Sequence, residues 1–372
     1  MNNNKKKIAF VLPSLNGGGA EKVFINLAIY FSKKNFEVTL LTINKKKDYN
    51  IELSKYKINF ICLNKSRLIF SILDLIIFFS KNKFDLILST ILHINILMFF
   101  LNKLFLKQKL ILRESNNIIL NIKNKNFVEK FIYNTLISFV YKYSHLIAPS
   151  SDLKYNLIKN YNLDPKKVIT INNPISIKFT EIYEIENFIS FLKKFGINGN
   201  EKTKIILSIG SLTDQKNHIQ IIKAFSKLKN ISNLKLIILG KGPLKNDLLK
   251  YIKDYNLVNN VFLVGFYSEV ELFLKYSNLY VCSSLWEGFP NALIDAASFN
   301  IPIISNNCDF GPSEILERGK FGGLCNPNDS KEMAQLIQSG LNGKIKIIPK
   351  DNFVSKYNID IIAKKYEKLL NV

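Results

Sequence analysis

Short apolar runs bounded by turn residues alternate with longer amphipathic stretches along the whole chain, and this alternation restricts the possible folds most strongly. Runs of this length are typical of buried strands, and the longer stretches have the periodicity of helices. A strand, a helix and a second strand in succession form a parallel βαβ unit. The predicted strands lie at residues 8–12, 37–42, 58–62, 86–89, 110–113, 146–149 and 168–171 in the first half of the chain, and at 205–210, 234–239, 261–264, 279–283 and 303–305 in the second.

Residues 172–202 separate the two sets of strands. This stretch contains a proline, two glycines and a change from basic to acidic composition, which is typical of a linker. A chain of 372 residues is also longer than one hydrophobic core usually supports. We therefore predict an α/β protein of two domains, at 1–180 and 200–350. A periodic amphipathic helix at about 355–372 is expected to pack back on the first domain or to close against the second.

The cysteines and the N-terminus exclude some classes of protein. The four cysteines stand far apart without a C-x-x-C pair, so we expect no zinc site and no disulfide framework, which fits a reducing cytoplasm. Basic residues precede the first apolar run, as in a signal peptide, but glycines and a helical pattern follow it at once. We interpret this run as a strand. Since no uncharged apolar run reaches eighteen residues, we expect no ordinary transmembrane helix.

The formal net charge is +23, and the first half of the chain carries most of it. Residues 1–180 hold 28 of the 52 Lys and Arg residues but only 10 of the 29 Asp and Glu residues. Such a charge favours a polyanion or an anionic membrane surface as partner, although a Lys-, Asn- and Ile-rich composition from an AT-rich genome explains it equally well. Apolar segments with basic neighbours, at 68–79, 95–109 and 131–148, fit either a membrane-surface protein or helices that cover a parallel sheet.

A glycine-rich loop at residues 17–19 follows the first predicted strand and opens a helix. Glycines there allow a tight turn and direct backbone N–H groups toward an anion at the positive end of the helix dipole. The loop matches neither the G-x-G-x-x-G fingerprint nor a Walker A loop. We expect a phosphate contact, and a plain strand-to-helix turn is the alternative.

Two further segments place charged residues at strand ends. Lys216 lies in a turn between a predicted strand and a helix, where its ammonium can neutralise a diphosphate; a solvated loop lysine is the alternative. The stretch SLWEGFPNALIDAAS places Glu287 before a helix and Asp295 inside it. Pro290 suits the first helical turn, and the N–H groups of Asn291 and its neighbours then face a phosphate.

The spacing of the two acids fits a nucleotide sugar that lies across this helix N-terminus. Glu287 then accepts hydrogen bonds from sugar hydroxyls, and Asp295 accepts one from a ribose. The alternative is that Glu287 is only a capping acid and Asp295 a surface residue.

Together these motifs resemble the retaining glycosyltransferases of family 4, which have the GT-B fold. The resemblance covers nearly the whole chain, through GGGAEKVFINLA, GSLTDQKNH, LGKGPLKNDL, the segment from VGFYSEVELF to NIPIIS, and CDFGPSEILERGKFGGLCNPND. It implies two Rossmann-like domains with parallel sheets that face a central cleft. The first domain is expected to hold most of the acceptor and the second most of the nucleotide sugar, with no metal and no cofactor.

The resemblance also implies roles for individual residues. Glu287 and Lys216 become the catalytic residues, holding the donor-sugar hydroxyls and the diphosphate respectively. The acceptor-side residues are His93, Arg113 and Asn116, although a structural role is the alternative for His93. The donor-binding residues are Gly17, Gly18, Ser211, Lys216, Glu287, Gly288, Phe289, Pro290, Asn291, Ala292 and Asp295.

Two positions depart from the family pattern. The E-x7-E motif ends in Asp295, one methylene shorter than glutamate, and Ser211 replaces the arginine of the R-x4-K pair. Arg113 is the candidate that compensates for the missing cation. Arg113 and Glu114 also occupy the place where many relatives carry a catalytic-site histidine.

Similarity at the level of a bacterial subgroup implies the substrates. The expected donor is UDP-GalNAc, with other hexose donors such as UDP-glucose and GDP-mannose still open. The expected acceptor is a lipid-linked oligosaccharide, a lipopolysaccharide or a capsule precursor, reached by a protein lying peripherally on the inner face of the cell membrane. A UDP-sugar epimerase of the same architecture and a basic nucleic-acid-binding protein are the alternatives, although no nucleic-acid-binding motif accompanies the charge.

Overall fold

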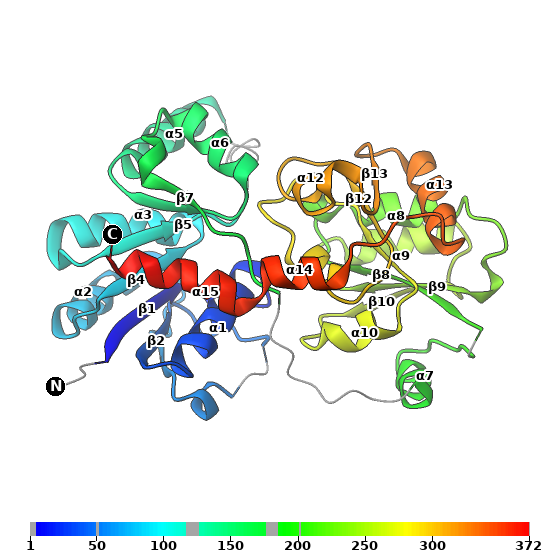
Figure 1. Cartoon of the computed structure of the whole chain (residues 1–372), viewed down its shortest axis with the longest axis horizontal. Helices are drawn as coiled ribbons and strands as arrows, with labels where there is room; N and C mark the ends of the chain where they lie inside the picture. The colour runs from blue at the N-terminus through cyan, green and yellow to red at the C-terminus, as the bar shows by residue number, and fades with distance from the viewer. Residues whose placement is uncertain (1–4, 50–51, 117–125, 176–184, 201, 372) are drawn as a thin grey trace. The chain divides into compact units, whose positions relative to one another are not determined.

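The computed structural model contains two compact α/β units (Figure 1). It describes residues 5–49, 52–116, 126–175, 185–200 and 202–371. The N-terminal unit consists of Met1–Ser176 and Tyr357–Val372, and the C-terminal unit of Ile177–Lys356. Each unit is built on its own parallel sheet, so the prediction of two Rossmann-like α/β domains is confirmed.

The N-terminal unit contains a 7-stranded sheet in the order β3-β2-β1-β4-β5-β6-β7. All the strands predicted for the first half of the chain are present. The strands are β1 (Lys6–Leu12), β2 (Phe36–Thr42), β3 (Asn59–Cys62), β4 (Leu86–Thr90), β5 (Leu110–Arg113), β6 (His145–Ala148) and β7 (Val168–Thr170). The helices are α1 (Gly19–Ser32), α2 (Ile72–Lys81), α3 (Leu92–Leu101), α5 (Phe127–Lys142) and α6 (Ser151–Tyr161).

The C-terminal unit contains a 6-stranded sheet in the order β10-β9-β8-β11-β12-β13. The predicted strands are again present, and β13 is an addition that the sequence analysis missed. The strands are β8 (Lys204–Ile209), β9 (Leu234–Leu239), β10 (Val261–Gly265), β11 (Leu279–Cys282), β12 (Ile303–Asn306) and β13 (Gly323–Cys325). The helices are α7 (Ile185–Lys193), α8 (His218–Phe225), α9 (Lys245–Asp254), α10 (Val270–Tyr276), α11 (Asn291–Ala297), α12 (Pro312–Ile315), α13 (Ser330–Leu341) and α14 (Lys350–Tyr357).

Both sheets have a point at which the strand order reverses. In the first sheet β1 is followed in the chain by β2 on one side, while β4 lies on its other side. In the second sheet β8 lies in the same way between β9 and β11. The loops at the carboxyl ends of such a strand pair diverge to opposite faces, and ligands of open α/β sheets bind in the crevice between them. These two places are therefore the expected ligand sites of the units.

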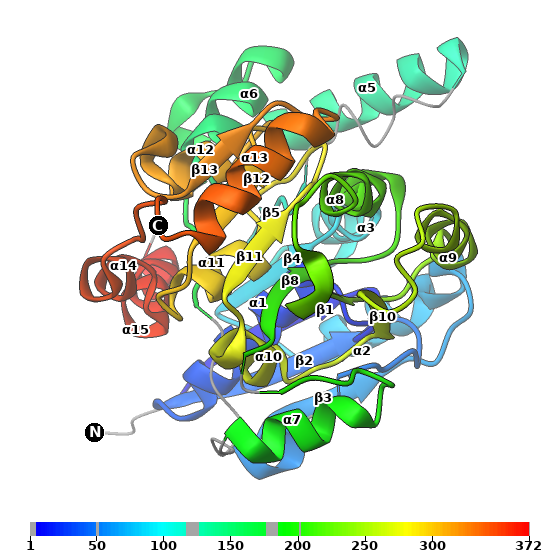
Figure 2. The ribbon, with the colours of Figure 1, turned by 90° about the vertical axis from the view of Figure 1, so that its right-hand side faces the viewer.

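The central strands are buried because helices cover both faces of each sheet (Figure 2). In β1 every residue from Ile8 to Leu12 is fully buried. The face of the first sheet that α2 and α3 cover forms one core cluster, which includes Val11, Phe79 and Met98. Among the described helices, none combines the length and the apolar character needed to cross a bilayer.

The last long helix, α15 (Ile359–Lys368), belongs to the N-terminal unit and packs against α1. The Asn358 side chain caps its start by accepting a hydrogen bond from the Asp360 N–H. Ile362, Ala363 and Tyr366 lie on its buried side, spaced as one face of a helix requires.

We expect Ile362→Ala to lower the free energy of unfolding of the N-terminal unit by about 2–5 kcal/mol, because it leaves a cavity at a fully buried site. The neighbouring Ile361 is 43% exposed, and Ile361→Ala is the matched control with little expected effect. Urea denaturation followed by circular dichroism measures both. Equal losses in the two variants would contradict the packing described for α15.

Candidate active site

Lys216 and Glu287 meet at the carboxyl ends of β8 and β11, where the strand order of the C-terminal sheet reverses. The Lys216 Nζ lies 2.5 Å from Glu287 Oε1. Glu287 is buried, and the lysine side chain is 22% exposed. The structure therefore brings the two predicted catalytic residues together at the expected ligand site of this sheet.

Two consecutive serines at the end of β11 hold this pair. The Ser283 hydroxyl donates a 2.6 Å hydrogen bond to the backbone oxygen of Lys216. The Ser284 hydroxyl donates a 2.6 Å hydrogen bond to Glu287 Oε1, the oxygen that also contacts the lysine. Sequence analysis missed both serines, although hydroxyl residues directly after a buried strand are the signal that points to them.

A second layer of amides supports the serines. Asn306, at the end of β12, donates through Nδ2 to the backbone oxygen of Ser283 at 2.7 Å. Gln220 on α8 donates to Asn306 Oδ1 at 3.0 Å, and both side chains are buried. Gln215 donates to the backbone oxygen of Trp286 at 2.9 Å. The loops after β8 and β11 are thus joined by side-chain hydrogen bonds, which restricts the movement of Lys216 and Glu287.

Glycines allow the loops around Lys216 to approach one another closely. A Cβ atom at Gly240, after β9, would lie 1.9 Å from the backbone oxygen of Gly210, after β8. A Cβ atom at Gly210 would in turn lie 3.0 Å from the side-chain carbons of Lys216. Only glycine fits at position 240, because any side chain there would collide with the backbone of Gly210. The loops that carry the motifs GSLTDQK and LGKG therefore pack directly against each other.

Burial and the charge of Glu287 shift the pKa of Lys216 in opposite directions. Burial alone lowers the pKa of Lys216, but the carboxylate of Glu287, with smaller contributions from nearby groups, outweighs it, so that the pKa lies above its ordinary value. Lys216 therefore carries a full positive charge at neutral pH, as binding of a diphosphate requires.

His218 begins α8 just after Lys216 and is buried in the same region. Its Nε2 lies 3.2 Å from the backbone oxygen of Gly210, and its Nδ1 lies 3.5 Å from the Ser208 hydroxyl. Burial lowers its pKa to about 4, and the charge of Lys216 contributes in the same direction. A neutral imidazole at this position supports the loop and keeps a second positive charge away from Lys216.

We expect His218 to make the C-terminal unit sensitive to acid. Its folded-state pKa lies below the ordinary value of 6.5, so the stabilisation is complete above pH 6.5 and is lost as the pH falls toward 4. The difference between the pKa of His218 in the unfolded and in the folded chain corresponds to about 3 kcal/mol in the free energy of unfolding. Urea denaturation across this range should show a shallower loss for His218→Gln than for the unchanged chain. His145→Gln, at an exposed site, is the control, and equal slopes for all three proteins would contradict the assignment.

The predicted donor segment after Glu287 is largely buried. Phe289 and Asp295 are 4% and 3% exposed, which excludes Asp295 as a surface residue. Pro290 is the N-cap of α11 rather than its first residue, and its backbone oxygen accepts hydrogen bonds from the N–H groups of Leu293 and Ile294. Gly288 is buried, and Asn291 and Ala292 are partly buried.

The contacts of Glu287 and Ser211 show the environment of each residue. Glu287 does not cap α11, because its carboxylate is bonded to Lys216 and Ser284. Ser211 is exposed, with its hydroxyl 3.3 Å from that of Thr213. The ribose and phosphate contacts assigned to Asp295 and Ser211 stay predictions.

The glycine loop of the N-terminal unit contains an acid that the sequence analysis missed. Gly17 has φ +73° and Gly18 is the N-cap of α1. Glu21, in the first turn, is 7% exposed, and its carboxyl group folds back on Gly18, where a Cβ atom would lie 2.1 Å from Oε2. Burial raises the pKa of Glu21. A carboxyl group thus occupies part of the helix start that the loop was expected to offer to a phosphate.

The acceptor-side residues fall into two environments. His93 is exposed at the start of α3, just after the carboxyl end of β4. The residue two positions before it, Ile91, has φ +74°, a conformation that costs a β-branched residue about 1–3 kcal/mol. Asn116 is partly buried after β5. His93 therefore lies beside the strand-order reversal of the N-terminal sheet, on a strained turn.

Arg113 differs from expectation because it is 1% exposed. Its guanidinium donates hydrogen bonds to the side chains of Asn173 and Thr90. The guanidinium is thus held by side chains of its own unit, and its role as the replacement for the cation missing at Ser211 stays a prediction. Burial also raises the pKa of its neighbour Glu114 to about 7, with Tyr141 donating a hydrogen bond to that carboxyl group.

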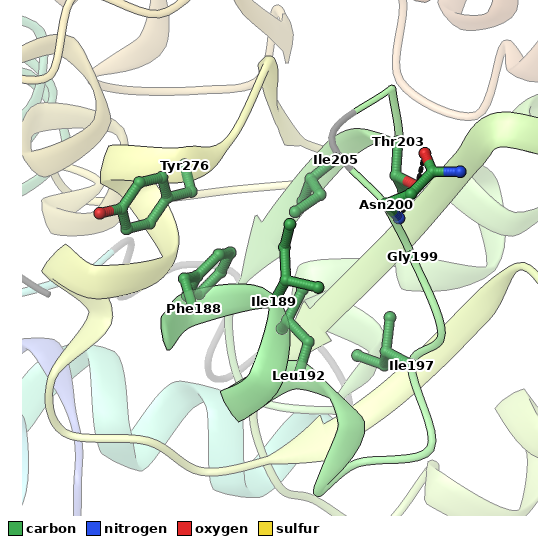
Figure 3. A pocket seen from close by; sticks show the side chains of 9 residues that line it. All are labelled: Phe188, Ile189, Leu192, Ile197, Gly199, Asn200, Thr203, Ile205 and Tyr276. Atoms are coloured by element: carbon green, nitrogen blue, oxygen red, sulfur yellow. Dashed lines mark hydrogen bonds between the residues drawn. The ribbon is translucent and has the colours of Figure 1, made fainter. Parts of the chain in front are cut away.

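A small apolar pocket lies elsewhere in the C-terminal unit, between α7 and the start of β8 (Figure 3). Phe188 stacks on Tyr276 there, with ring centroids 4.6 Å apart, and Ile205 lines the pocket from the amino end of β8. Lys216 follows the opposite end of that strand, and no predicted site residue lines the pocket. Within the described ranges, no group of three or more His, Cys, Asp or Glu residues could hold a metal ion.

Comparisons with known proteins match both units. Residues 17–179 match the family model described as Glycosyltransferase Family 4, and residues 191–361 match the model described as Glycosyl transferases group 1. An N-acetylgalactosamine-N,N'-diacetylbacillosaminyl-diphospho-undecaprenol 4-alpha-N-acetylgalactosaminyltransferase from Campylobacter jejuni is 30% identical over 349 residues, covering 90% of each chain.

Two other proteins extend the comparison. An uncharacterized glycosyltransferase from Methanocaldococcus jannaschii is 37% identical over 231 residues, which cover 58% of this chain and 53% of that protein. The crystal structure of Anabaena HepE in complex with UDP and glucose has a TM-score of 0.78 at 15% identity, covering 98% of this chain and 99% of HepE. The structural likeness shows a shared fold.

Proposed function

The chain belongs to glycosyltransferase family 4 and has the GT-B fold class, and from this membership we propose that it is a retaining, metal-independent hexosyltransferase. Its proposed donor is UDP-GalNAc and its proposed acceptor a lipid-linked oligosaccharide, a lipopolysaccharide or a capsule precursor. The observation that carries the proposal is the cluster of Lys216, Glu287 and Ser284 at the strand-order reversal of the C-terminal sheet.

The geometry of this cluster leaves bonding capacity for a nucleotide sugar. An ammonium has three donors, so Lys216 can contact Glu287 and still direct donors to a diphosphate. Glu287 accepts hydrogen bonds from Lys216 and Ser284 through Oε1, and we assign Oε2 to hydroxyl groups of the donor sugar. Asp295 is assigned to the ribose. Gly17 and Gly18 are assigned to the donor side of the N-terminal unit.

The reaction we infer is a front-face substitution. An acceptor hydroxyl oxygen bonds to the anomeric carbon on the side from which the diphosphate leaves, the bond from that carbon to the phosphate oxygen breaks, and the hydroxyl proton passes to the departing phosphate. Lys216 stabilises the charge that develops on the diphosphate. Glu287 positions the sugar and takes no proton. His93 and Asn116 are proposed for the acceptor side.

The relatives support the choice of substrates. The Campylobacter relative is named as an N-acetylgalactosaminyltransferase acting on an undecaprenol-linked glycan, and the Anabaena structure holds UDP and glucose. These names favour UDP over GDP and a lipid-linked acceptor over a free sugar. We infer from the acceptor that the protein works peripherally at the inner face of the cell membrane.

We expect Glu287→Gln to lower kcat by about 100-fold, because the sugar loses a charged positioning group, and to reduce turnover more than it reduces the stability of the fold. Ser284→Ala should lower kcat less and should be rescued by Ser284→Thr, which restores the hydroxyl. Glu317→Gln, at an exposed acid of the same unit, is the control. The assay is release of UDP from UDP-GalNAc with a lipid-linked acceptor. Full activity of Glu287→Gln, or unfolding of that variant, would refute the assignment.

The decisive experiment compares nucleotides, donors and acceptors in sequence. Calorimetry with UDP, GDP and NAD tests the nucleotide, and UDP release from UDP-GalNAc, UDP-GlcNAc and UDP-glucose with and without membrane lipid extract tests the donor and acceptor. A glycosyltransferase requires the extract, whereas an epimerase converts the donor without it. The anomeric configuration of the product, measured by NMR, tests retention, and unchanged activity in EDTA tests metal independence. Absence of nucleotide binding at millimolar concentration would refute the proposal.

A further inference from the structure

Large apolar side chains are exposed on the N-terminal unit far more than elsewhere in the described parts of the chain. The C-terminal unit exposes Leu249, Tyr255 and Val258. The N-terminal unit exposes such residues on α2, on the short π-turn η3 (Asn102–Leu106) and on α5. Examples on these three elements are Leu73 at 72%, Ile77 at 53%, Leu104 at 62%, Phe105 at 56%, Phe127 at 84% and Phe131 at 67%. The unit also exposes Ile69 and Phe70 just before α2, and Phe60, Tyr155 and Ile361 on other elements.

These three elements lie along one face of the N-terminal sheet. The buried sides of α2, α3 and η3 share a single core cluster. The Lys103 ammonium of η3 lies 4.9 Å from the ring centroids of both Phe139 and Tyr143, at the end of α5, and Phe99 of α3 contacts the Phe139 ring. Both views show α3 between α2 and α5 (Figures 1 and 2). The exposed residues therefore belong to one row of helices.

On α2 the exposed and buried residues occupy different sides of the helix. Leu75 and Phe79 are fully buried against the sheet, whereas Leu73 and Ile77 are exposed. A helix that is apolar on its outer side as well as its core side requires a second apolar partner, because water does not stabilise such a face.

Basic residues surround this apolar row. Five exposed basic residues lie next to these elements. Those near α2 are Arg67, Lys81 and Lys83. Lys107 directly follows η3, and Lys142 is the last residue of α5. Three acidic residues lie nearby. Asp74 is paired with Lys65 at 2.8 Å, and Asp85 accepts a hydrogen bond from the Lys7 N–H at 2.7 Å. Glu129 is exposed in the first turn of α5, so basic residues outnumber acidic ones around the row. Exposed apolar side chains bordered by cations match a bilayer with anionic headgroups.

We propose that the outer side of α2, η3 and α5, the membrane face, seats the protein on an anionic lipid bilayer with its apolar side chains at headgroup depth. The proposal deepens the proposed function, since it names the surface by which the protein reaches a lipid-linked acceptor. It rests on exposed side chains and charge, so vesicle binding can be measured without donor or acceptor.

Co-sedimentation of the full chain with phosphatidylcholine vesicles, with and without phosphatidylglycerol, tests the membrane face. Binding should require phosphatidylglycerol and weaken at high salt. The double variants Leu73→Ser with Ile77→Ser and Phe127→Ser with Phe131→Ser should each lower the vesicle affinity at least about tenfold. The matched control, Leu249→Ser with Val258→Ser, changes two exposed apolar residues of the other unit and should bind as the unchanged chain does.

Two further measurements separate the possible outcomes. Calorimetry with UDP should be unchanged in the membrane-face variants, so that loss of vesicle binding is distinguished from loss of the donor site. Gel filtration tests whether the same face joins two copies of the chain. The proposal is overturned if the unchanged chain does not bind the vesicles, if the control loses as much affinity as the membrane-face variants, or if those variants only dissociate a dimer.

Discussion

The reversal of strand order in each parallel sheet is the constraint on which the rest of this structure depends. Where neighbouring crossovers run to opposite sides, the loops at the carboxyl ends of two central strands separate and leave backbone and side chains exposed to a ligand. In the C-terminal unit the separated loops follow β8 and β11 and carry Lys216 and Glu287. In the N-terminal unit they follow β1 and β4 and carry the glycine loop and His93. In each unit the strand order therefore determines where the candidate site residues lie.

The partly buried ion pair of Lys216 and Glu287 depends on the polar groups around it. A carboxylate and an ammonium removed from water lose hydration that their mutual attraction restores only with good geometry and additional hydrogen bonds. Ser284 supplies one such bond to the carboxylate, and Ser283 fixes the backbone of the lysine. Neighbouring residues at a strand end point to opposite sides, which is why two adjacent serines can serve two different loops.

The sequence predicted the fold well because burial on both faces of a parallel sheet produces continuous apolar runs. β13 was missed because it has three residues and begins with glycine, so it carries too little apolar signal. The positions of Lys216 and Glu287 were predicted from strand ends and helix starts. The burial of Arg113, the carboxyl group of Glu21 against Gly18 and the two serines were not, because each depends on a neighbour that is distant in the chain or on a rotamer that a linear pattern does not contain.

The N-terminal unit is assembled from two separate stretches of the chain, and this has a consequence for its synthesis. Residues 1–176 leave the ribosome before the C-terminal unit, but α15, whose buried side packs against α1, leaves it only afterwards. All of Ile177–Lys356 is translated in the interval, at about 5–20 residues per second. The surface of α1 that α15 covers therefore stays open to chaperones for many seconds, and the C-terminal unit can finish folding before the unit that was begun first.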